Sequence, residues 1–357
     1  MPVKEEIQKK IALIIPAYEP DERFTALLVE IRKDFNGHIV VVNDGSGSEY
    51  QEYFVKAKEL GCEILEHYTN MGKGRALKNA FNYCLSSHPD LVGCVTADSD
   101  GQHCPGDIFR CMEELLINND SLIMGCRDFS KEDVPTRSKL GNKFTRGIFR
   151  YLCGVKTTDT QTGLRGIPAS FMVRLLNVRG ERFEFESMML LEARDKYPIK
   201  EIFIETIYES KENHKSHYNT LRDSVRIGKI FAEVFIKFLF SSISSTVLDM
   251  LLFTLLCIVF KPMLAIYYVT ISAICARIVS ATYNFLINYS LVFRSEADKK
   301  SSAIKYVILA IVQGSISAIL ITLFVQLIPF MNETVIKGIV DVSLFFVSYF
   351  IQRRFVF

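Results

Sequence analysis

The stretch "LVGCVTADSDGQH" (residues 91–103) ends an apolar run with two aspartates, Asp98 and Asp100, which only Ser99 separates. An apolar run of this length is typical of a buried strand. At the end of such a strand both carboxylates can turn toward one point, and Gln102 adds a third oxygen. Oxygen ligands of this kind suit Mg²⁺ or Mn²⁺. The alternative is a solvated surface turn, which is what most isolated aspartate pairs with this spacing form.

Similar apolar runs recur through the first half of the chain, separated by stretches whose apolar residues fall at helical spacing. Strands that alternate with helices predict an α/β layer with a largely parallel sheet. Ligands of such sheets bind beyond the carboxyl ends of the strands, and the polar groups 16–19, 43–46 and 98–102 each close a predicted strand. The predicted strands are 11–18, 38–46, 62–68, 91–100 and 121–128, and the predicted helices are 23–35, 52–61, 74–87 and 107–119.

The two halves of the chain differ in composition. The chain of 357 residues is mixed and charged up to about Lys229, whereas long apolar runs dominate from about Glu233 onward. A net charge of +2, with no arm rich in Lys and Arg, argues against nucleic-acid binding. The nine cysteines include no CxxC pair, which favours free thiols in a reducing compartment. The charged start, "MPVKEEIQKK" (1–10), has no apolar core of signal-peptide length, so we expect the first domain to stay in the cytosol.

Four hydrophobic spans of roughly membrane-crossing length occupy the second half, near residues 235–260, 264–290, 304–329 and 335–352. Basic residues concentrate before the first span, between the second and third spans, and after the fourth. By the positive-inside rule, the amino-terminal domain, the middle loop and the carboxyl end all face the cytosol. We therefore expect a multi-pass protein of the plasma (cytoplasmic) membrane with four transmembrane helices.

The spans show a weak internal repeat, which suggests two helical hairpins of common design. Related segments open the first and third spans, and another related pair closes the second and fourth. The opening pair is "IKFLFSSISS" (236–245) and "IKYVILAIVQ" (304–313), and the closing pair is "NFLINYSLVF" (284–293) and "SYFIQRRFVF" (348–357). A charge at membrane depth needs a partner or an aqueous cavity. Asp249 with Arg277 is the expected pair, and Asp341 is a third ionisable residue in this region.

Two more predicted strand ends carry candidate binding groups. Asp44, followed by Gly45, can accept hydrogen bonds from a ribose or a base, and the alternative is a turn closed by its own side chain. The segment "TNMGKGRALKNA" (69–80) places Lys73 and Arg75 at the start of a helix, where an anion such as phosphate is favoured. A solvated helix start would have the same sequence. The segment lacks the Walker pattern, which argues against a P-loop enzyme.

These motifs, in this order, resemble the family 2 glycosyltransferases of the GT-A fold. Within that family the chain looks most similar to the polyprenyl-phosphate glycosyltransferases, the group of dolichol-phosphate mannose synthase and the bacterial undecaprenyl-phosphate glucosyltransferases. The hydrophobic half resembles the GtrA-like membrane domain of four helices. The resemblance covers about residues 11–217 and rests on "IPAYEP", "VVNDGS", "NMGKGRALKNA", "ADSDGQH", "GCRDF", "RSKLGN" and "DTQTGLRG".

The resemblance implies three parts of the chain and a role for each matching residue. The parts would be a GT-A (nucleotide-diphospho-sugar transferase) domain of α/β class at 1–217, a juxtamembrane amphipathic helix at 218–232 and an all-α four-helix transmembrane domain at 233–357. The nucleotide would be held by Pro16, Tyr18, Glu19 and Asp44, with Lys73 and Arg75 near it. The metal and the diphosphate would be held by Asp98, Asp100 and Gln102. The acceptor phosphate or the sugar diphosphate would be held by Arg127, Arg137 and Ser138.

Asp159 lies where the family has its acceptor-side acid, which is usually proposed as the base. A lipid phosphate is already an anion at neutral pH, so this carboxylate would either act as the base or position the acceptor or the sugar. The chain departs from the family after its last predicted strand. Many members carry "GxSK" after the last strand of the family's fold, whereas this chain has "YESKENHKSHYN" (208–219), with His217 at the final Lys. Lys211, Lys215 and Ser216 are the candidate substitutes.

The resemblance implies an inverting, metal-dependent transfer of a hexose from a UDP- or GDP-linked donor to undecaprenyl or dolichyl phosphate. The product would be a lipid-linked sugar for cell-envelope glycosylation. Amphipathic patterns at 137–152 and 218–240 suit helices that lie on anionic headgroups beside the site. Expected partners are a nucleotide sugar, a polyprenyl phosphate and membrane lipids, without nucleic acid and with a homo-oligomer left open.

Two other functions compete with this reading. A processive polysaccharide synthase shares the fold but carries a QxxRW motif, and this chain has no tryptophan. Alternatively, the membrane half flips a lipid-linked sugar or serves as an anchor, and the first domain only binds a sugar nucleotide. The complete set of expected metal and phosphate residues argues against an inactive first domain.

Overall fold

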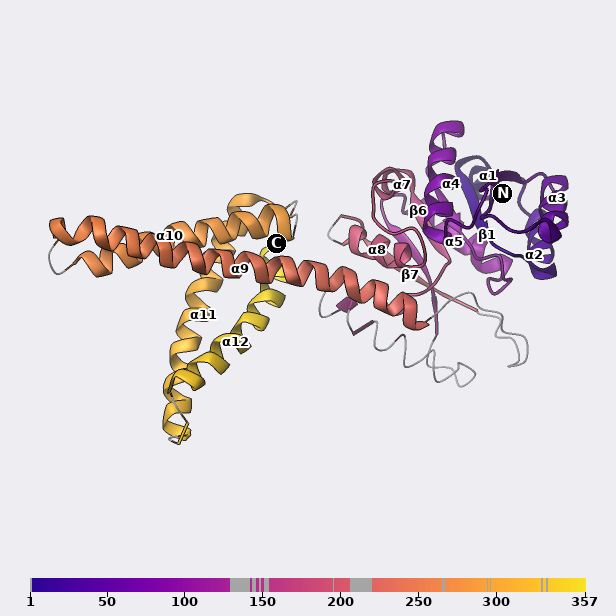
Figure 1. Cartoon of the computed structure of the whole chain (residues 1–357). Coiled ribbons are helices and arrows are strands. Elements are labelled where there is room, and N and C mark those ends of the chain that lie inside the picture. The colour runs from indigo at the N-terminus through magenta and orange to yellow at the C-terminus, as the bar shows by residue number, and fades with distance from the viewer. Residues whose placement is uncertain are drawn as a thin grey trace. The chain divides into compact units, whose positions relative to one another are not determined.

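The computed structural model describes residues 2–128, 142, 146–147, 149–150, 154–194, 196–205, 220–264, 267–293, 295, 297–328, 330–331 and 333–357 (Figure 1). The chain divides into two compact units, Met1–Arg226 and Ile227–Phe357. The first unit contains every strand among the described residues, and the second is helical.

A seven-stranded sheet forms the centre of the first unit, in the order β3-β2-β1-β4-β6-β5-β7. All neighbours in the sheet pair in parallel except β6, which runs antiparallel to both β4 and β5. The predicted α/β class and largely parallel sheet are therefore confirmed. The strands are β1 (Ile11–Ala17), β2 (Ile39–Asn43), β3 (Glu63–Glu66), β4 (Gly93–Thr96), β5 (Leu122–Arg127), β6 (Arg165–Pro168) and β7 (Ile199–Ile204).

The five predicted strands all occur, each shorter than its apolar run, and the sequence reading did not include β6 and β7. β6 has only four residues, "RGIP", two of which are Gly and Pro. These residue types are depleted in strands, so local propensity gave no indication of it. β6 forms because Gly93 to Thr96 of β4 pair along its whole length.

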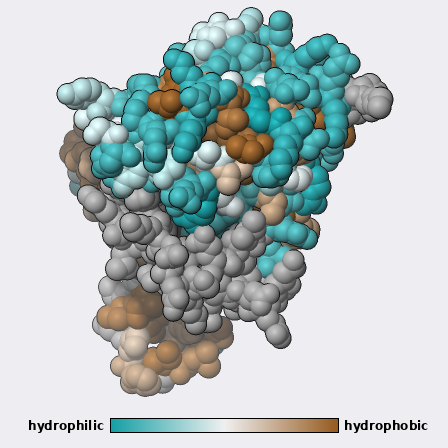
Figure 2. Space-filling model, turned by 90° about the vertical axis from the view of Figure 1, so that its right-hand side faces the viewer, coloured by the Kyte–Doolittle hydropathy of each residue, from teal (hydrophilic) through white to brown (hydrophobic). Residues whose placement is uncertain are grey.

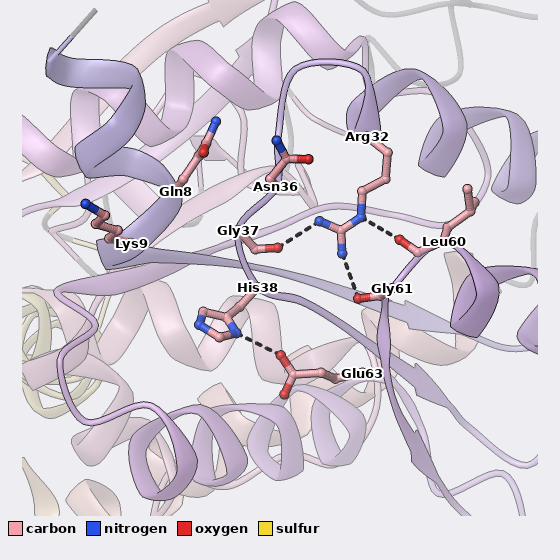
Figure 3. Close-up of a pocket in the computed structure, with 9 residues that line it drawn as sticks. All are labelled: Gln8, Lys9, Arg32, Asn36, Gly37, His38, Leu60, Gly61 and Glu63. Carbon is pink, nitrogen blue, oxygen red and sulfur yellow. Dashed lines mark hydrogen bonds and ion pairs between the residues drawn. The ribbon is translucent and has the colours of Figure 1, made fainter.

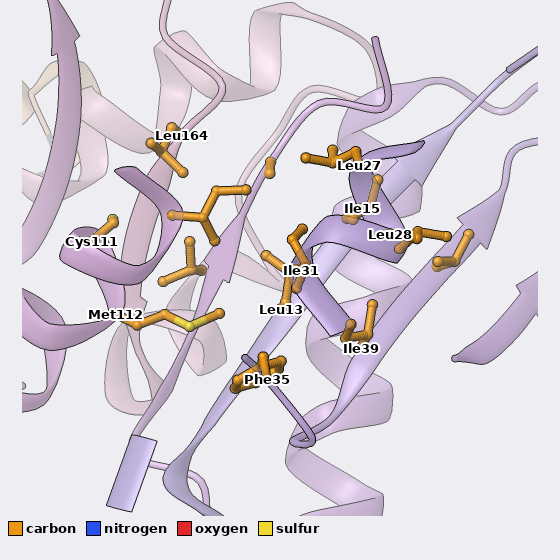
Figure 4. Close-up of a cluster of buried hydrophobic side chains, with 14 of the residues drawn as sticks. Leu13, Ile15, Leu27, Leu28, Ile31, Phe35, Ile39, Cys111, Met112 and Leu164 are labelled. Atoms are coloured by element: carbon orange, nitrogen blue, oxygen red, sulfur yellow. The ribbon is translucent and has the colours of Figure 1, made fainter. Parts of the chain in front are cut away.

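Helices cover both faces of this sheet. Both faces of β1 are apolar and must be covered. Leu13 and Ile15 lie in a buried cluster with residues of α2 (Figure 4), and Ile14, on the opposite face of the strand, is also fully buried. The helices of this unit are α1 (Pro2–Lys10), α2 (Glu22–Arg32), α3 (Gln51–Glu59), α4 (Lys73–Ser87), α5 (Pro105–Ile117), α7 (Ala169–Leu175) and α8 (Glu184–Ala193), with a 3₁₀ turn at Ser48–Tyr50.

Sequence signals account for the start and the buried side of α2. The Asp21 side chain accepts a hydrogen bond from the main-chain nitrogen of Arg23 and so caps the helix. Phe24, Leu28 and Ile31 recur at helical spacing and are buried against the sheet. The outer surface of this unit is mainly hydrophilic in the view of Figure 2. The first unit is thus built as a water-exposed α/β domain.

The parallel pairing brings three strand ends to one edge of the sheet. β1 ends at Ala17, β2 at Asn43 and β4 at Thr96. The main-chain nitrogen of Asp44 donates to the oxygen of Ala17 over 2.9 Å, which joins the first two ends directly. The polar loops that the sequence analysis singled out therefore gather at this carboxyl edge.

The described residues of the second unit form most of α9 (Thr220–Leu264), which begins before the unit boundary, together with α10 (Tyr268–Ile287), α11 (Lys299–Leu327), α12 (Glu333–Ile351) and two short π-helical turns. Within the described part of the chain, three helical segments are long and apolar enough to cross a membrane by length and composition: Ala232–Pro262, Ile271–Val292 and Lys299–Phe324. The fourth helix, α12, has 19 residues and an apolar composition. Its crossing of the membrane, and the cytosolic orientation of both chain ends, stay predictions.

Two π-helical turns give the predicted repeat a structural counterpart. They follow α10 at Asn288–Val292 and α12 at Gln352–Val356, where the related segments close their hairpins. Each turn starts with a buried amide that donates four residues back, Asn288 to Asn284 over 2.8 Å and Gln352 to Ser348 over 3.0 Å. The two turns also contact each other, because Asn288 Nδ2 donates to Gln352 Oε1 over 3.1 Å.

Other contacts in the second unit agree with this symmetry and with the predicted charge pair. Phe293 and Phe357, the last residues of the two related segments, stack with ring centroids 5.1 Å apart. Arg277 and Asp249 form an ion pair of 3.4 Å, which confirms the pairing expected from the sequence. Asp341 accepts a hydrogen bond from the hydroxyl of Ser317 over 2.8 Å.

The amide pair predicts a measurable coupling between the two hairpins. In reversible SDS unfolding of the full chain, N288A and Q352A should each destabilise the second unit, and the double variant should lose less than the sum. Polar contacts between membrane helices average about 0.6 kcal/mol and reach about 1.7 kcal/mol, so a coupling in this range is expected. S315A, which removes an exposed hydroxyl bonded within its own helix, should combine additively with N288A. Additive losses for N288A and Q352A would show that the two amides do not stabilise the contact between the hairpins.

Candidate active site

Asp44 organises the loops of the carboxyl edge. Its carboxylate is buried and accepts hydrogen bonds from the main-chain nitrogens of Met71 (2.9 Å) and Gly72 (2.8 Å) and from His67 Nδ1 (2.8 Å). The turn after β2 is closed by Asn43 instead, whose Oδ1 accepts from the nitrogen of Ser46. Asp44 thus fixes the loop that leads into α4, and its contact with a nucleotide stays a prediction.

The loop after β1 is tied to the loop after β2. Glu19 has a positive φ of 50°, and its main-chain nitrogen donates to the hydroxyl of Ser46 over 2.9 Å. The pKa of Tyr18 is raised, first by its hydrogen bond with Glu19 and then by burial. Pro16, the residue before the end of β1, pairs with Val42 of β2. Pro16, Tyr18 and Glu19 thus lie at the edge of the sheet where the nucleotide is predicted to bind.

Lys73 lies at the centre of the site. Its ammonium is 2.6 Å from Asp98 Oδ1 and 2.8 Å from Glu186 Oε1, and only 14% of its side chain is exposed. Burial on its own would lower the pKa of Lys73, but the two carboxylates outweigh it and raise the pKa above its usual value. The same ion pair joins the first turn of α4 to the loop after β4 and to α8.

The glycines beside Lys73 serve close packing. A Cβ at Gly72, whose φ is 98°, would lie 2.5 Å from Arg182 Cγ, and a Cβ at Gly74 would lie 2.6 Å from Phe185 Cβ. Arg75 is held by the same segment, because its Nε lies 2.6 Å from an oxygen of Glu181. The two glycines beside Lys73 therefore let residues 181–185 approach the start of α4.

Asp98 and Asp100 differ in their electrostatic surroundings. Burial would raise the pKa of Asp98, but Lys73 and His103, whose Nε2 is 3.5 Å from Asp98 Oδ2, lower it below its usual value. The pKa of Asp100 is raised, first by burial and then by the Asp98 carboxylate. Its Oδ1 accepts a hydrogen bond from the main-chain nitrogen of Gln102 over 3.1 Å.

The acidic pair fits a hard divalent cation. Two carboxylates lie close enough for the charge of one to disfavour ionisation of the other, and a cation would relieve that repulsion. The chain also leaves room beside them, because position 163 is glycine and a Cβ there would overlap the Asp98 carboxylate. Asp98 and Asp100 are the residues of this edge that would hold Mg²⁺ or Mn²⁺.

Arg127 and Asp159 form a second charged group at the same edge. β5 runs in the same direction as β4, so its last residue, Arg127, lies at the carboxyl ends as well. Arg127 donates from Nε to one oxygen of Asp159 over 2.7 Å and from a terminal nitrogen to the other over 3.1 Å. The Asp159 side chain is fully buried and also accepts from the nitrogen of Gln161 over 3.0 Å. Asp159 is therefore placed to hold the guanidinium fork in one orientation.

Several residues of this site were not found from the sequence. Glu186 and Glu181 lie in a stretch that the sequence reading assigned to no element, and nothing local marks them as partners of Lys73 and Arg75. His103 ends the quoted motif "ADSDGQH", but nothing in that motif indicates a role for it, and His67 lies in none of the quoted motifs. Three sequence-predicted residues, Arg137, Ser138 and Lys215, lie outside the described residues.

Comparisons with known proteins agree with the order of these motifs. Residues 12–175 match the family described as glycosyl transferase family 2, and residues 237–357 match the GtrA/DPMS transmembrane domain. An uncharacterized protein of Methanocaldococcus jannaschii is 29% identical over 209 residues, which cover 57% of this chain and 84% of that protein. A UDP-N-acetylglucosamine–dolichyl-phosphate N-acetylglucosaminyltransferase of Methanococcus voltae is 27% identical over 219 residues, covering 56% of this chain and 86% of that enzyme.

A solved structure also matches part of this chain. It is glucosyl-3-phosphoglycerate synthase of Mycobacterium tuberculosis in complex with Mn²⁺, uridine diphosphate and glucosyl-3-phosphoglycerate. The match has 13% sequence identity and a TM-score of 0.47, and it covers 58% of this chain and 75% of the other.

The two aspartates should have opposite effects on stability. Asp98 has a lowered pKa, so its charge stabilises the fold above the unfolded value of about 3.9, and D98N should lower the Tm at pH 7 by several degrees. Asp100 has a raised pKa, so its charge destabilises the fold at pH 7, and D100N should raise the Tm.

Thermal unfolding of the full chain between pH 4 and pH 8 checks both signs. The gain from D100N should shrink as the pH falls toward about 4, because wild-type Asp100 then becomes protonated in both states. A D100N variant that is less stable than wild type at pH 7 would show that this carboxylate is not under uncompensated repulsion.

Proposed function

We propose that this chain, a family 2 glycosyltransferase domain joined to a GtrA/DPMS transmembrane domain, transfers a hexose from a nucleoside diphosphate sugar to a polyprenyl phosphate. The observation that carries the proposal is the pair of charged groups at one sheet edge. Asp98 and Asp100 suit the cation and diphosphate of a donor, and the Arg127–Asp159 pair suits an acceptor phosphate. The name of the Methanococcus voltae relative, which pairs a UDP-sugar with dolichyl phosphate, supports this choice of substrates.

The donor side depends on how Lys73 and the acidic pair share charge. A divalent cation bound by Asp98 and Asp100 would supply Lewis-acid stabilisation of the departing diphosphate. Lys73 keeps Asp98 ionised and oriented, since its ammonium contacts Oδ1 directly. Glu186 balances the remaining charge of Lys73 and fixes its position. Asp44 holds the preceding loop, so the donor meets a preorganised edge.

The acceptor side depends on orientation more than on proton transfer. A phosphate monoester carries at least one negative charge at neutral pH, and its oxygen can attack without a strong base. Asp159 has both oxygens engaged by the guanidinium of Arg127. We assign Asp159 as the residue that positions Arg127, and Arg127 as the group that contacts the phosphate. In-line attack on the anomeric carbon then inverts its configuration.

The membrane unit supplies the reason for a lipid acceptor. Its apolar helices retain the chain at the bilayer, where a polyprenyl tail stays while the phosphate reaches the headgroup region. The proposed orientation places the first domain on the cytosolic face, where nucleotide sugars are made. The product would be a lipid-linked sugar.

The transferase activity is tested with purified full-length protein, undecaprenyl or dolichyl phosphate, and a panel of radiolabelled UDP- and GDP-sugars. We expect chloroform-soluble label with at least one donor, abolished by EDTA and lowered about 100-fold or more in D100A, since D100A removes charge stabilisation of the leaving group. D90A, which removes an exposed aspartate, is the matched control and should keep full activity. Binding of sugar nucleotides without formation of a chloroform-soluble product from any donor would contradict the proposal.

The role of Asp159 is tested by comparing R127Q, D159N and the double variant. If Asp159 acts through Arg127, each single change and the double change should reduce kcat/KM to a similar extent. D159N should also keep the pH profile of wild type. A D159N profile that has lost its acidic limb, with R127Q and D159N losses that multiply, would identify Asp159 as a base instead.

A further inference from the structure

A second cluster of ligand-type side chains lies at the opposite edge of the sheet. His38 immediately precedes β2, Glu63 is the first residue of β3, and His88 ends α4. Asp44 and Asp98, in contrast, follow the carboxyl ends of β2 and β4. Because these strands are parallel, the histidine cluster is separated from the candidate active site by the length of the sheet.

The imidazoles of His38 and His88 both contact the carboxylate of Glu63. His38 Nδ1 lies 2.9 Å from Glu63 Oε1, and His88 Nε2 lies 2.9 Å from Glu63 Oε2. The two imidazole rings lie close together, with centroids 3.8 Å apart and an interplanar angle of 36°. One ligand atom from each of the three residues lies within 4.8 Å of the others. Small rotations of these side chains would bring all three atoms to one ion at the usual bond lengths of about 2.0–2.2 Å.

The main chain around the cluster is fixed by Arg32. Its guanidinium donates to the carbonyl oxygens of Gly37 (2.8 Å), Leu60 (2.8 Å) and Gly61 (2.9 Å). Figure 3 shows these bonds together with His38 and Glu63. Arg32 thus ties the turn before His38 to the turn before Glu63, so both ligands are positioned before any ion binds.

The three side chains are partly exposed to solvent, and one of them is a carboxylate that can neutralise a bound cation. The side chains of His38, Glu63 and His88 are 39%, 27% and 19% exposed. A pocket of ≈ 520 Å³, lined by His38, Glu63 and Arg32 among others, opens beside them. Burial would raise the pKa of Glu63, but hydrogen bonds from His88, Tyr83 and His38 outweigh it and lower the pKa, so the carboxylate is ionised at neutral pH.

We propose that His38, Glu63 and His88 form a binding site for a transition-metal ion, with Zn²⁺ the best fit. Two imidazole nitrogens and one carboxylate are a common zinc donor set, whereas Mg²⁺ prefers oxygen ligands throughout. A water molecule would complete four-coordination, while the Tyr83 hydroxyl, which lies 2.7 Å from Glu63 Oε2, orients that carboxylate. To bind the ion, each imidazole must present the lone pair of one ring nitrogen, which the tautomer protonated at the other ring nitrogen provides.

The site would stabilise the edge of the sheet. β3 is the outermost strand on its side, and the three ligands connect it to β2 and to the end of α4. An ion that binds only the folded chain stabilises it in proportion to the logarithm of its concentration above the dissociation constant. The expected readout is therefore thermal stability, and not turnover at the distant active site.

The test uses EDTA-stripped full-length protein in detergent, with excess Mg²⁺ present so that hard-cation sites are filled. Calorimetric titration with Zn²⁺ and metal analysis should give one bound Zn²⁺ per chain in wild type and a rise in Tm of several degrees. H38A, H88A and E63Q should each lose this equivalent or weaken it at least 10-fold. Y83F, which removes a hydrogen bond to the same carboxylate but no proposed ligand, should retain it, as should E59Q, which changes an exposed glutamate.

A second measurement needs no variant. Co²⁺ added to wild type should give the visible absorption of a four-coordinate, imidazole-bound ion, and Zn²⁺ should displace it. The proposal is overturned if wild type shows neither this spectrum nor a Zn²⁺-dependent Tm. It is also overturned if the histidine variants bind Zn²⁺ as wild type does, since the three residues would then be a hydrogen-bonded group only.

Discussion

The ion pairs of Lys73 hold the catalytic edge together. A largely buried ammonium is stable only with partners, and Lys73 finds two, Asp98 and Glu186, on separate elements. This requirement explains the neighbouring sequence, because glycines at 72 and 74 let the segment that carries Glu186 pack against α4. The position of the carboxylate proposed to hold the donor's cation is therefore set by a resident cation of the protein itself.

The two units solve the problem of buried polar groups in different ways. In the first unit, charged residues compensate one another at a sheet edge that water can reach, and the proposed chemistry takes place there. In the second unit, neutral amides join the two hairpins, since the buried Asn288 Nδ2 donates a hydrogen bond to the buried Gln352 Oε1. The matching π-helical turns agree with the predicted repeat of one hairpin design.

The sequence predicted what depends on local pattern. Alternating apolar runs located five strands, four helices and the strand ends, and Asp98 and Asp100 stood out because two charges followed a buried strand. β6 was missed because its stability comes from pairing with β4, not from its own residues. Glu186 was missed for a related reason: its role depends on a contact with Lys73 across more than a hundred residues, which no spacing rule records. The packing role of Gly72 and Gly74 depends on the same distant segment, residues 181–185.

The central claim is that the site transfers a sugar, and not a sugar phosphate, to a lipid phosphate. Phosphorus NMR of the purified lipid product and of the released nucleotide tests this most directly. The account predicts that the acceptor's phosphate monoester becomes a phosphodiester while a nucleoside diphosphate is released. A lipid product that contains a diphosphate, with a nucleoside monophosphate released, would contradict it.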